Sequence, residues 1–183
     1  MKKHVLLIQG GGEDGYEADI KLKNELQTAL GADYVISYPE IKTDETARGY
    51  GWPGQIEKAI KQCGEHLIVV AHSLGASLLL QYLSEYQLTK KPIGIFLLAA
   101  AFWSGDEDWK QPLKLQVNFA EHLPKHIPMY FYHCRDDEEV PFSHLAIYRQ
   151  QVPSATFREL DNGGHLFNRQ LNQLVKDIET MKT

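Results

Sequence analysis

The sequence is poor in cysteine and has no long apolar run. Its two cysteines, Cys63 and Cys134, are too few for a disulfide framework or a cysteine-based metal site, so both are expected to be reduced and buried. No segment approaches the ~20 apolar residues that cross a membrane. The apolar run after Lys2-Lys3 ends at Gln9, well short of a signal-peptide core. These absences predict a cytoplasmic protein without a membrane span.

An excess of positive charge is also missing. The chain has 19 basic and 24 acidic residues, a net charge of −5, and its basic residues are scattered, so no nucleic-acid partner is expected. Hydrophobic residues make up 43% and charged residues 23%, as in ordinary globular proteins. The 183 residues show no repeat, low-complexity tract or linker, and their number is typical of a single domain spanning 1–183.

Apolar runs alternate with segments of helical periodicity along the chain. Strands are predicted at 5–8, 34–38, 67–70, 93–101, 128–134 and 156–160. Helices are predicted at 18–30, 56–64, 76–83, 115–123, 142–151 and 166–181, and loops at 40–54 and 102–111. This alternation predicts a three-layer, doubly wound α/β fold with a six-stranded parallel sheet. Ligands of such sheets collect at the carboxyl ends of the strands, so candidate site residues are those that directly follow a strand.

The segment Val69-Val70-Ala71-His72-Ser73-Leu74-Gly75-Ala76 joins a buried strand directly to a helix. Ser73 lies at the apex of the turn, and the small residues Ala71 and Gly75 flank it. This pattern is typical of a nucleophile elbow, in which a sharp turn lifts a hydroxyl above the sheet. The alternative is that Ser73 is an ordinary helix N-cap, a position that favours serine.

An acid and a histidine follow two later strands. Asp136 and Asp137 come after the fifth strand, and Asp161-Asn162-Gly163-Gly164-His165 comes after the sixth. A serine nucleophile needs a neutral imidazole, and the imidazole needs a carboxylate that fixes its tautomer. Consecutive side chains of an extended segment point in opposite directions, so only one aspartate can readily reach the histidine. Asp137 is the preferred acid and Asp136 is expected to cap or to face solvent. The alternative for His165 is a loop residue that caps a helix.

These motifs resemble those of the α/β-hydrolase family over nearly the whole chain. The resemblance rests on the segments 8–12, 71–75, 137–141 and 164–167, and the family elbow G-x-S-x-G has Ala71 in place of its first glycine. The short chain, without an inserted cap domain, is similar to the small serine hydrolases that include retinoblastoma-binding protein 9 and its bacterial relatives. The resemblance implies a minimal α/β-hydrolase sheet in the order 2-1-3-4-5-6.

The resemblance also implies an oxyanion hole. Its donors are expected to be the backbone N–H of Leu74 and that of Gly11, with Gly12 as second choice, because glycine allows a close approach to the substrate oxygen. The predicted reaction is hydrolysis of a small ester, thioester or activated amide through an acyl-enzyme. Ser73 attacks, His165 transfers the proton and Asp137 orients His165. The residues expected to line the substrate pocket are Gly12, Trp52, Phe102 and Trp103. A small acyl substrate is the expected partner. No cofactor or metal is expected, and no protein partner is indicated.

Two other functions stay open at this point. Gly10, Gly12 and Gly15 fit the dinucleotide fingerprint G-x-G-x-x-G, although Glu40 is the only candidate for its ribose-binding acid. An α/β domain of low activity could instead bind a protein through loop aromatic residues, namely Trp52, Phe102, Trp103 and Trp109. A metal hydrolase is disfavoured, because Pro124 breaks the helix on which His122 and His126 would share a face.

Overall fold

A computed structural model describes residues 2–12, 14–103 and 108–181 of the chain, and the loop predicted at 102–111 is therefore described only in part. The sheet is parallel, and its strand order, β2-β1-β3-β4-β5-β6, is the one that the resemblance implied. The strands are β1 (Lys3–Ile8), β2 (Tyr34–Ser37), β3 (Leu67–His72), β4 (Gly94–Leu98), β5 (Met129–Cys134) and β6 (Thr156–Leu160).

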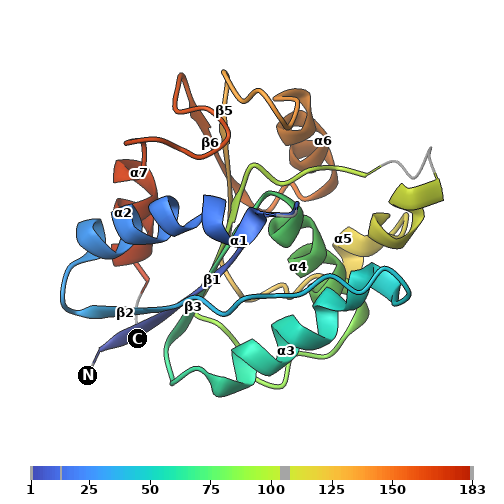
Figure 1. The fold of residues 1–183 in the computed structure, drawn as a ribbon, viewed down its shortest axis with the longest axis horizontal. Coiled ribbons are helices and arrows are strands. Elements are labelled where there is room, and N and C mark those ends of the chain that lie inside the picture. Colours follow the sequence, from blue (N-terminus) through green and yellow to red (C-terminus); the bar gives the residue numbers. More distant parts are fainter. Residues whose placement is uncertain (1, 13, 104–107, 182–183) are drawn as a thin grey trace.

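Helices cover both faces of this sheet, so the predicted three-layer architecture is confirmed. Figure 1 shows α2 and α7 on one side and α3, α4, α5 and α6 on the other. The α-helices are α1 (Gly15–Ala18), α2 (Ile20–Leu30), α3 (Trp52–Gln62), α4 (Ser73–Glu85), α5 (Phe119–His122), α6 (Ser143–Gln151) and α7 (Asn172–Glu179). Two 3₁₀-helices are η1 (Arg48–Gly51) and η2 (Asp108–Leu113).

The central strands are buried on both faces because their residues alternate between two hydrophobic cores. In β3, Val69 and Ala71 pack in the core beneath α3 and α4, whereas Ile68 and Val70 pack in the core beneath α2 and α7. All four side chains are 0% exposed. This explains why the strand sequences are continuous apolar runs rather than alternating ones.

Helix α3 begins at Trp52, whereas the sequence predicted a loop as far as Gly54. Pro53 suits this position, because the first turn of a helix needs no N–H from it and its fixed φ fits the helix. The Trp52 side chain is 1% exposed in the core, and its indole N–H donates to the Thr43 hydroxyl at 3.2 Å. The prediction that Trp52 lines a substrate pocket was therefore wrong.

The helix predicted from Ala18 to Leu30 is broken at Asp19. Ala18 ends α1 and is exposed, whereas Asp19 is 1% exposed and lies three residues before Leu22. The buried side of this segment is therefore formed by the leucines of α2 together with one acidic side chain, that of Asp19.

Two other predicted helices are shorter in the structure. Helix α7 begins at Asn172 rather than at Leu166, because the preceding residues form turns in which Phe167 and Arg169 have positive φ. Helix α5 begins at Phe119 rather than at Leu115. No helix in the described ranges is both long enough and apolar enough to span a membrane.

We expect Gly75 to be indispensable for the packing of α4 on the sheet. A Cβ at this position would overlap the carbonyl oxygen of Gln9, just beyond β1, and would lie 2.8 Å from Cγ2 of Ile8. Gly75→Ala should lower the free energy of unfolding by about 3 kcal/mol, the upper part of the usual range for overpacking. Denaturant unfolding measures the loss.

Gly54→Ala is the matched control. Gly54 lies in α3, and a methyl group added to it would have no neighbouring atom within 4 Å, so alanine there should raise stability, by up to about 1 kcal/mol. Equal stability of the two alanine variants would contradict the packing argument.

Candidate active site

Ser73 occupies a strained turn between β3 and α4. Its φ is +52°, a left-handed backbone conformation that residues other than glycine rarely adopt. Ala71, which replaces the first glycine of the elbow pattern, lies within β3 and is 0% exposed, so its methyl group packs in the core and does not enter the turn. The turn thus places Ser73 at the carboxyl end of a central strand.

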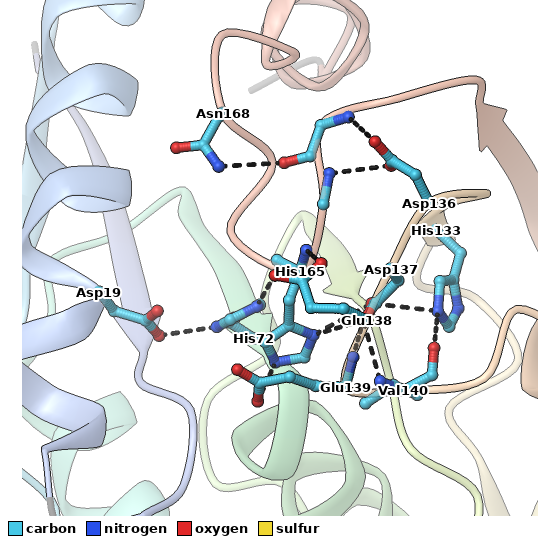
Figure 2. A network of polar contacts seen from close by, with 12 residues as sticks. Asp19, His72, His133, Asp136, Asp137, Glu138, Glu139, Val140, His165 and Asn168 are labelled. Carbon is cyan, nitrogen blue, oxygen red and sulfur yellow. Dashed lines mark hydrogen bonds and ion pairs between the residues drawn. The ribbon is translucent and has the colours of Figure 1, made fainter.

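The structure brings Asp137, rather than Asp136, to His165. The Nδ1 atom of His165 lies 3.0 Å from both carboxylate oxygens of Asp137. Asp136 instead accepts hydrogen bonds from the backbone N–H groups of Gly163 and Gly164, at 3.2 and 2.9 Å. One aspartate therefore contacts the imidazole while its neighbour holds the loop that carries it (Figure 2).

The Asp137 carboxylate is held ionised by its surroundings. Its side chain is 0% exposed, and burial opposes its ionisation. Contacts with the His133 and His165 rings and hydrogen bonds from the backbone N–H groups of Glu139 and Val140 outweigh burial and lower the Asp137 pKa. Asp137 is therefore a fixed negative charge beneath the imidazole.

His133 is a contact of Asp137 that was not predicted from the sequence. Its Nε2 lies 3.2 Å from Oδ2 of Asp137 and 3.0 Å from the carbonyl oxygen of Val140, and the residue is 1% exposed. The available signal was a polar residue inside the apolar fifth strand, four positions before the aspartate.

The environment of His165 favours its protonated form. Burial lowers the pKa of this imidazole. The hydrogen bond to Asp137 and the negative charges of Asp137, Glu139 and Asp19 raise the pKa by more than burial lowers it, so the net shift is upward. Glu139 lies closest to the second ring nitrogen, with its Oε2 atom 3.5 Å from Nε2. His165 is thus a base whose affinity for a proton is increased by three carboxylates.

A cavity of about 260 Å³ lies beside Ser73 and His165, and both residues line it. The glycine loop after β1 forms another wall, including Gly11 and Gly12. The loop lies close to the residue after the serine, because a Cβ on Gly11 would be 2.9 Å from Cβ of Leu74. The backbone N–H of Gly10 donates to Asp19 at 2.7 Å, which leaves Gly11 and Gly12 as the loop's candidate donors to the cavity.

A second cavity, of about 360 Å³, adjoins the same region. Phe102, Trp103 and His144 line it, together with Val140 and Pro141, and Glu139 borders both cavities. Phe102 and Trp103, which were predicted to line a substrate pocket, therefore lie beside a cavity near the site.

Among the residues that the structure describes, those that a dinucleotide site or a metal site would need do not come together around these two cavities. Glu40 is exposed and lines neither cavity, although a dinucleotide site would require it near the glycine loop. Within the described part of the chain, no group of three or more His, Cys, Asp or Glu side chains is arranged to hold a metal ion.

Comparison with known families identifies the family of the chain. A family model described as serine hydrolase matches residues 23–173. The chain belongs to the serine hydrolase family. Comparison with curated protein sequences finds no match.

Solved structures share the fold of this serine hydrolase. SOBER1 from Arabidopsis thaliana is 15% identical with a TM-score of 0.66, and the match covers 98% of each chain. The ydeN gene product of B. subtilis is 17% identical with a TM-score of 0.65, covering 98% of this chain and 100% of that one. CarC, a serine hydrolase involved in carbazole degradation, is 11% identical with a TM-score of 0.69, covering 98% and 92%. At these identities the likeness establishes the α/β-hydrolase fold.

We expect His165 to titrate above the ordinary histidine pKa of about 6.5. Its pKa is raised, so a larger fraction of the imidazole is protonated at neutral pH than in an exposed histidine. Glu139→Gln removes one of the charges that raise the pKa and should move the titration to lower pH. NMR titration of the histidine ring protons measures both values.

Glu121→Gln is the control for this change, because it removes an exposed carboxylate from α5, which precedes β5 and so lies toward the opposite end of the sheet. This variant should leave the His165 titration unchanged. A His165 pKa at or below that of an exposed histidine in the wild-type protein would contradict the interpretation.

Proposed function

We propose that this serine hydrolase cleaves a small ester, thioester or activated amide through an acyl-enzyme on Ser73. The observation that carries the proposal is the Asp137–His165 pair beside the cavity that Ser73 lines. A carboxylate only accepts hydrogen bonds, so Nδ1 of His165 carries the proton in this pair and Nε2 is left as the acceptor. The Ser73 hydroxyl then has a base within the same cavity.

The reaction proceeds in two halves. The Ser73 oxygen attacks the substrate carbonyl carbon while its proton passes to Nε2 of His165, and the carbonyl oxygen becomes an oxyanion. When the tetrahedral intermediate collapses, the bond to the leaving group breaks and Nε2 returns the proton to the departing alcohol, thiol or amine. Water repeats the sequence on the acyl-enzyme and releases the acid. Asp137 stabilises the imidazolium formed in each half.

The oxyanion is bound by the backbone N–H groups of Leu74 and Gly11. The close packing of Gly11 against the Leu74 side chain supports this assignment. Gly12, also on the cavity wall, is the second choice for the loop donor. Loss of one such donor typically raises the barrier by about 3 kcal/mol.

The two cavities suit the two parts of a small substrate. They lie on either side of Glu139, whose side chain is 66% exposed and can be displaced by a substrate approaching Nε2. Phe102 and Trp103 supply apolar surface on one side. Burial lowers the pKa of His144, and its Nδ1 accepts the N–H of Phe102 at 3.0 Å, so this neutral ring carries its proton on Nε2. The larger cavity therefore combines apolar walls with an uncharged N–H donor on His144, and the charged residues Lys110 and Glu139 also line it.

Ser73→Ala should abolish labelling by a fluorophosphonate probe and lower kcat on a p-nitrophenyl ester roughly 10⁴- to 10⁶-fold. His165→Ala should have a similar effect, and the double variant should be no worse, because the residues act as one unit. Peptide mass analysis locates the adduct on the wild-type chain. Ser77→Ala is the control, since this serine lies one turn further along α4 and its hydroxyl bonds the carbonyl of Ala101. Wild-type turnover in the Ser73 and His165 variants would contradict the proposal.

Asp137→Asn should lower kcat about 10⁴-fold, because an amide at this position favours the wrong tautomer of His165. Asp136→Asn keeps one of the two acceptor oxygens that bond the N–H groups of Gly163 and Gly164, and should cost at most about tenfold, less than the ~100-fold loss expected when a catalytic group shifts by about 1 Å. Steady-state kinetics of the two variants on one ester makes the comparison. A larger loss in the Asp136 variant would reverse the assignment of the acid.

A further inference from the structure

A second buried acid–histidine pair lies on the other side of the catalytic histidine. Asp19 and His72 are each 1% exposed, and Oδ2 of Asp19 lies 2.9 Å from Nδ1 of His72. The same oxygen accepts the backbone N–H of Gly10, and Nε2 of His72 lies 2.9 Å from the carbonyl oxygen of His165. Figure 2 shows Asp19 and Asp137 on opposite sides of the His72 and His165 rings. Neither Asp19 nor His72 has a role in the mechanism described above.

Both nitrogens of His72 face groups that accept hydrogen bonds. A backbone carbonyl can only accept, so Nε2 of His72 carries a proton and donates it to the oxygen of His165. The other ring nitrogen, Nδ1, faces the Asp19 carboxylate, which also accepts the N–H of Gly10. The pair therefore closes a chain of buried hydrogen bonds from the Gly10 N–H, through Asp19 and His72, to the backbone carbonyl of His165.

We propose that Asp19 and His72 are positioning residues that lock the glycine loop and the catalytic histidine into one arrangement. This inference rests on the proposed function. Through Gly10, Asp19 fixes the loop whose next residue supplies an oxyanion donor. Through His72, it fixes the backbone of His165. The Asp19–His72 pair is thus a tether that links the glycine loop to the backbone of the catalytic histidine.

The tether completes the support of His165. Asp137 holds the ring at Nδ1, Glu138 accepts the backbone N–H at 3.1 Å, and His72 donates to the backbone carbonyl. The rings of His72 and His165 also pack together, with centroids 4.6 Å apart. A shift of about 1 Å in a catalytic group can cost about 100-fold in rate, so a support of this kind acts on kcat.

Asp19 also acts on His165 through its charge. The charged or titratable groups that face His165 are Asp137, Glu139, Asp19, Glu138 and the His72 ring. Asp19 is among the carboxylates that raise the pKa of His165. Neutralising Asp19 should therefore lower this pKa, which loss of packing alone would not do.

Asp19→Asn is the direct test. An uncharged amide binds hydrogen-bond partners more weakly than a carboxylate does, so the contacts with Nδ1 of His72 and with the N–H of Gly10 are both weakened. We expect kcat on a p-nitrophenyl ester to fall about 10- to 100-fold with KM within about twofold of wild type. The acidic limb of the pH profile of kcat/KM should move to lower pH, and so should the His165 titration followed by NMR.

Asp177→Asn is the matched control. Asp177 is also a buried carboxylate, 6% exposed, and accepts hydrogen bonds from Tyr132 and Arg158 at 2.6 and 2.9 Å. This variant should lose stability but keep wild-type kcat and the wild-type position of the acidic limb. The tether is refuted if Asp19→Asn keeps both values, or if Asp177→Asn changes them to the same extent.

Two further measurements apply if the Asp19 variant does not fold. His72→Phe keeps an aromatic ring against His165 and Phe167 but has no N–H, so it should show the same loss of kcat; unchanged kcat refutes the tether. In the wild-type protein the Nε2 proton of His72 should exchange slowly with solvent, and rapid exchange also refutes it. If the wild-type protein neither reacts with the probe nor cleaves esters, the proposed function fails, while the NMR titration and exchange measurements still decide the tether.

Discussion

The close contact between Gly75 and the backbone of Gln9 is the constraint on which the site depends. It brings the first turn of α4 against the end of β1, so the turn at Ser73 and the glycine loop meet above the sheet. Gln9 extends the arrangement, because its side chain is buried and accepts the backbone N–H of Ile41 at 2.9 Å. These contacts fix strand β1, helix α4 and the segment after β2 relative to one another, independently of the contacts among Ser73, His165 and Asp137.

Electrostatic compensation is the second condition for this arrangement. Burying a carboxylate costs several kcal/mol unless it is paired and hydrogen-bonded. Asp19 and Asp137 meet this requirement with different histidines, and both do so at the carboxyl end of the sheet. Asp177 on α7 is compensated by Arg158 of β6. The site thus concentrates negative charge around His165, in a chain whose net charge is −5.

The positions of the three candidate catalytic residues after the ends of β3, β5 and β6 could be predicted from local patterns and the edge rule of parallel sheets, whereas the strand order followed from the resemblance to the α/β-hydrolase family. The strand 156–160 has its predicted bounds. Helix starts were predicted less well. Pro53 and Gly54 are loop signals in sequence, yet they form the first turn of α3, where proline is compatible with helical geometry. The assignment of Trp52 to a pocket followed from the same error.

The supporting residues were harder to predict because their roles depend on long-range contacts. Asp19 meets His72 across 53 residues, and His133 reaches Asp137 only because β5 ends in a tight turn. One signal was present for Asp19, which shares a helical face with Leu22 and Leu26 and so places an acid among buried leucines. A charged residue on an apolar helical face requires a partner, but the sequence alone does not say which.

The thiol of Cys134 illustrates a consequence of this concentration of carboxylates. It ends β5, beside the aspartates, and is 0% exposed. Burial raises its pKa to about 12, and the nearby charges of Asp136, Asp137 and Glu138 act in the same direction. The sulfur therefore stays in its unreactive, protonated form at neutral pH. An oxidant or alkylating agent finds no thiolate at this position, and the Asp137 charge that strengthens the imidazole as a base also helps to keep the neighbouring sulfur protonated.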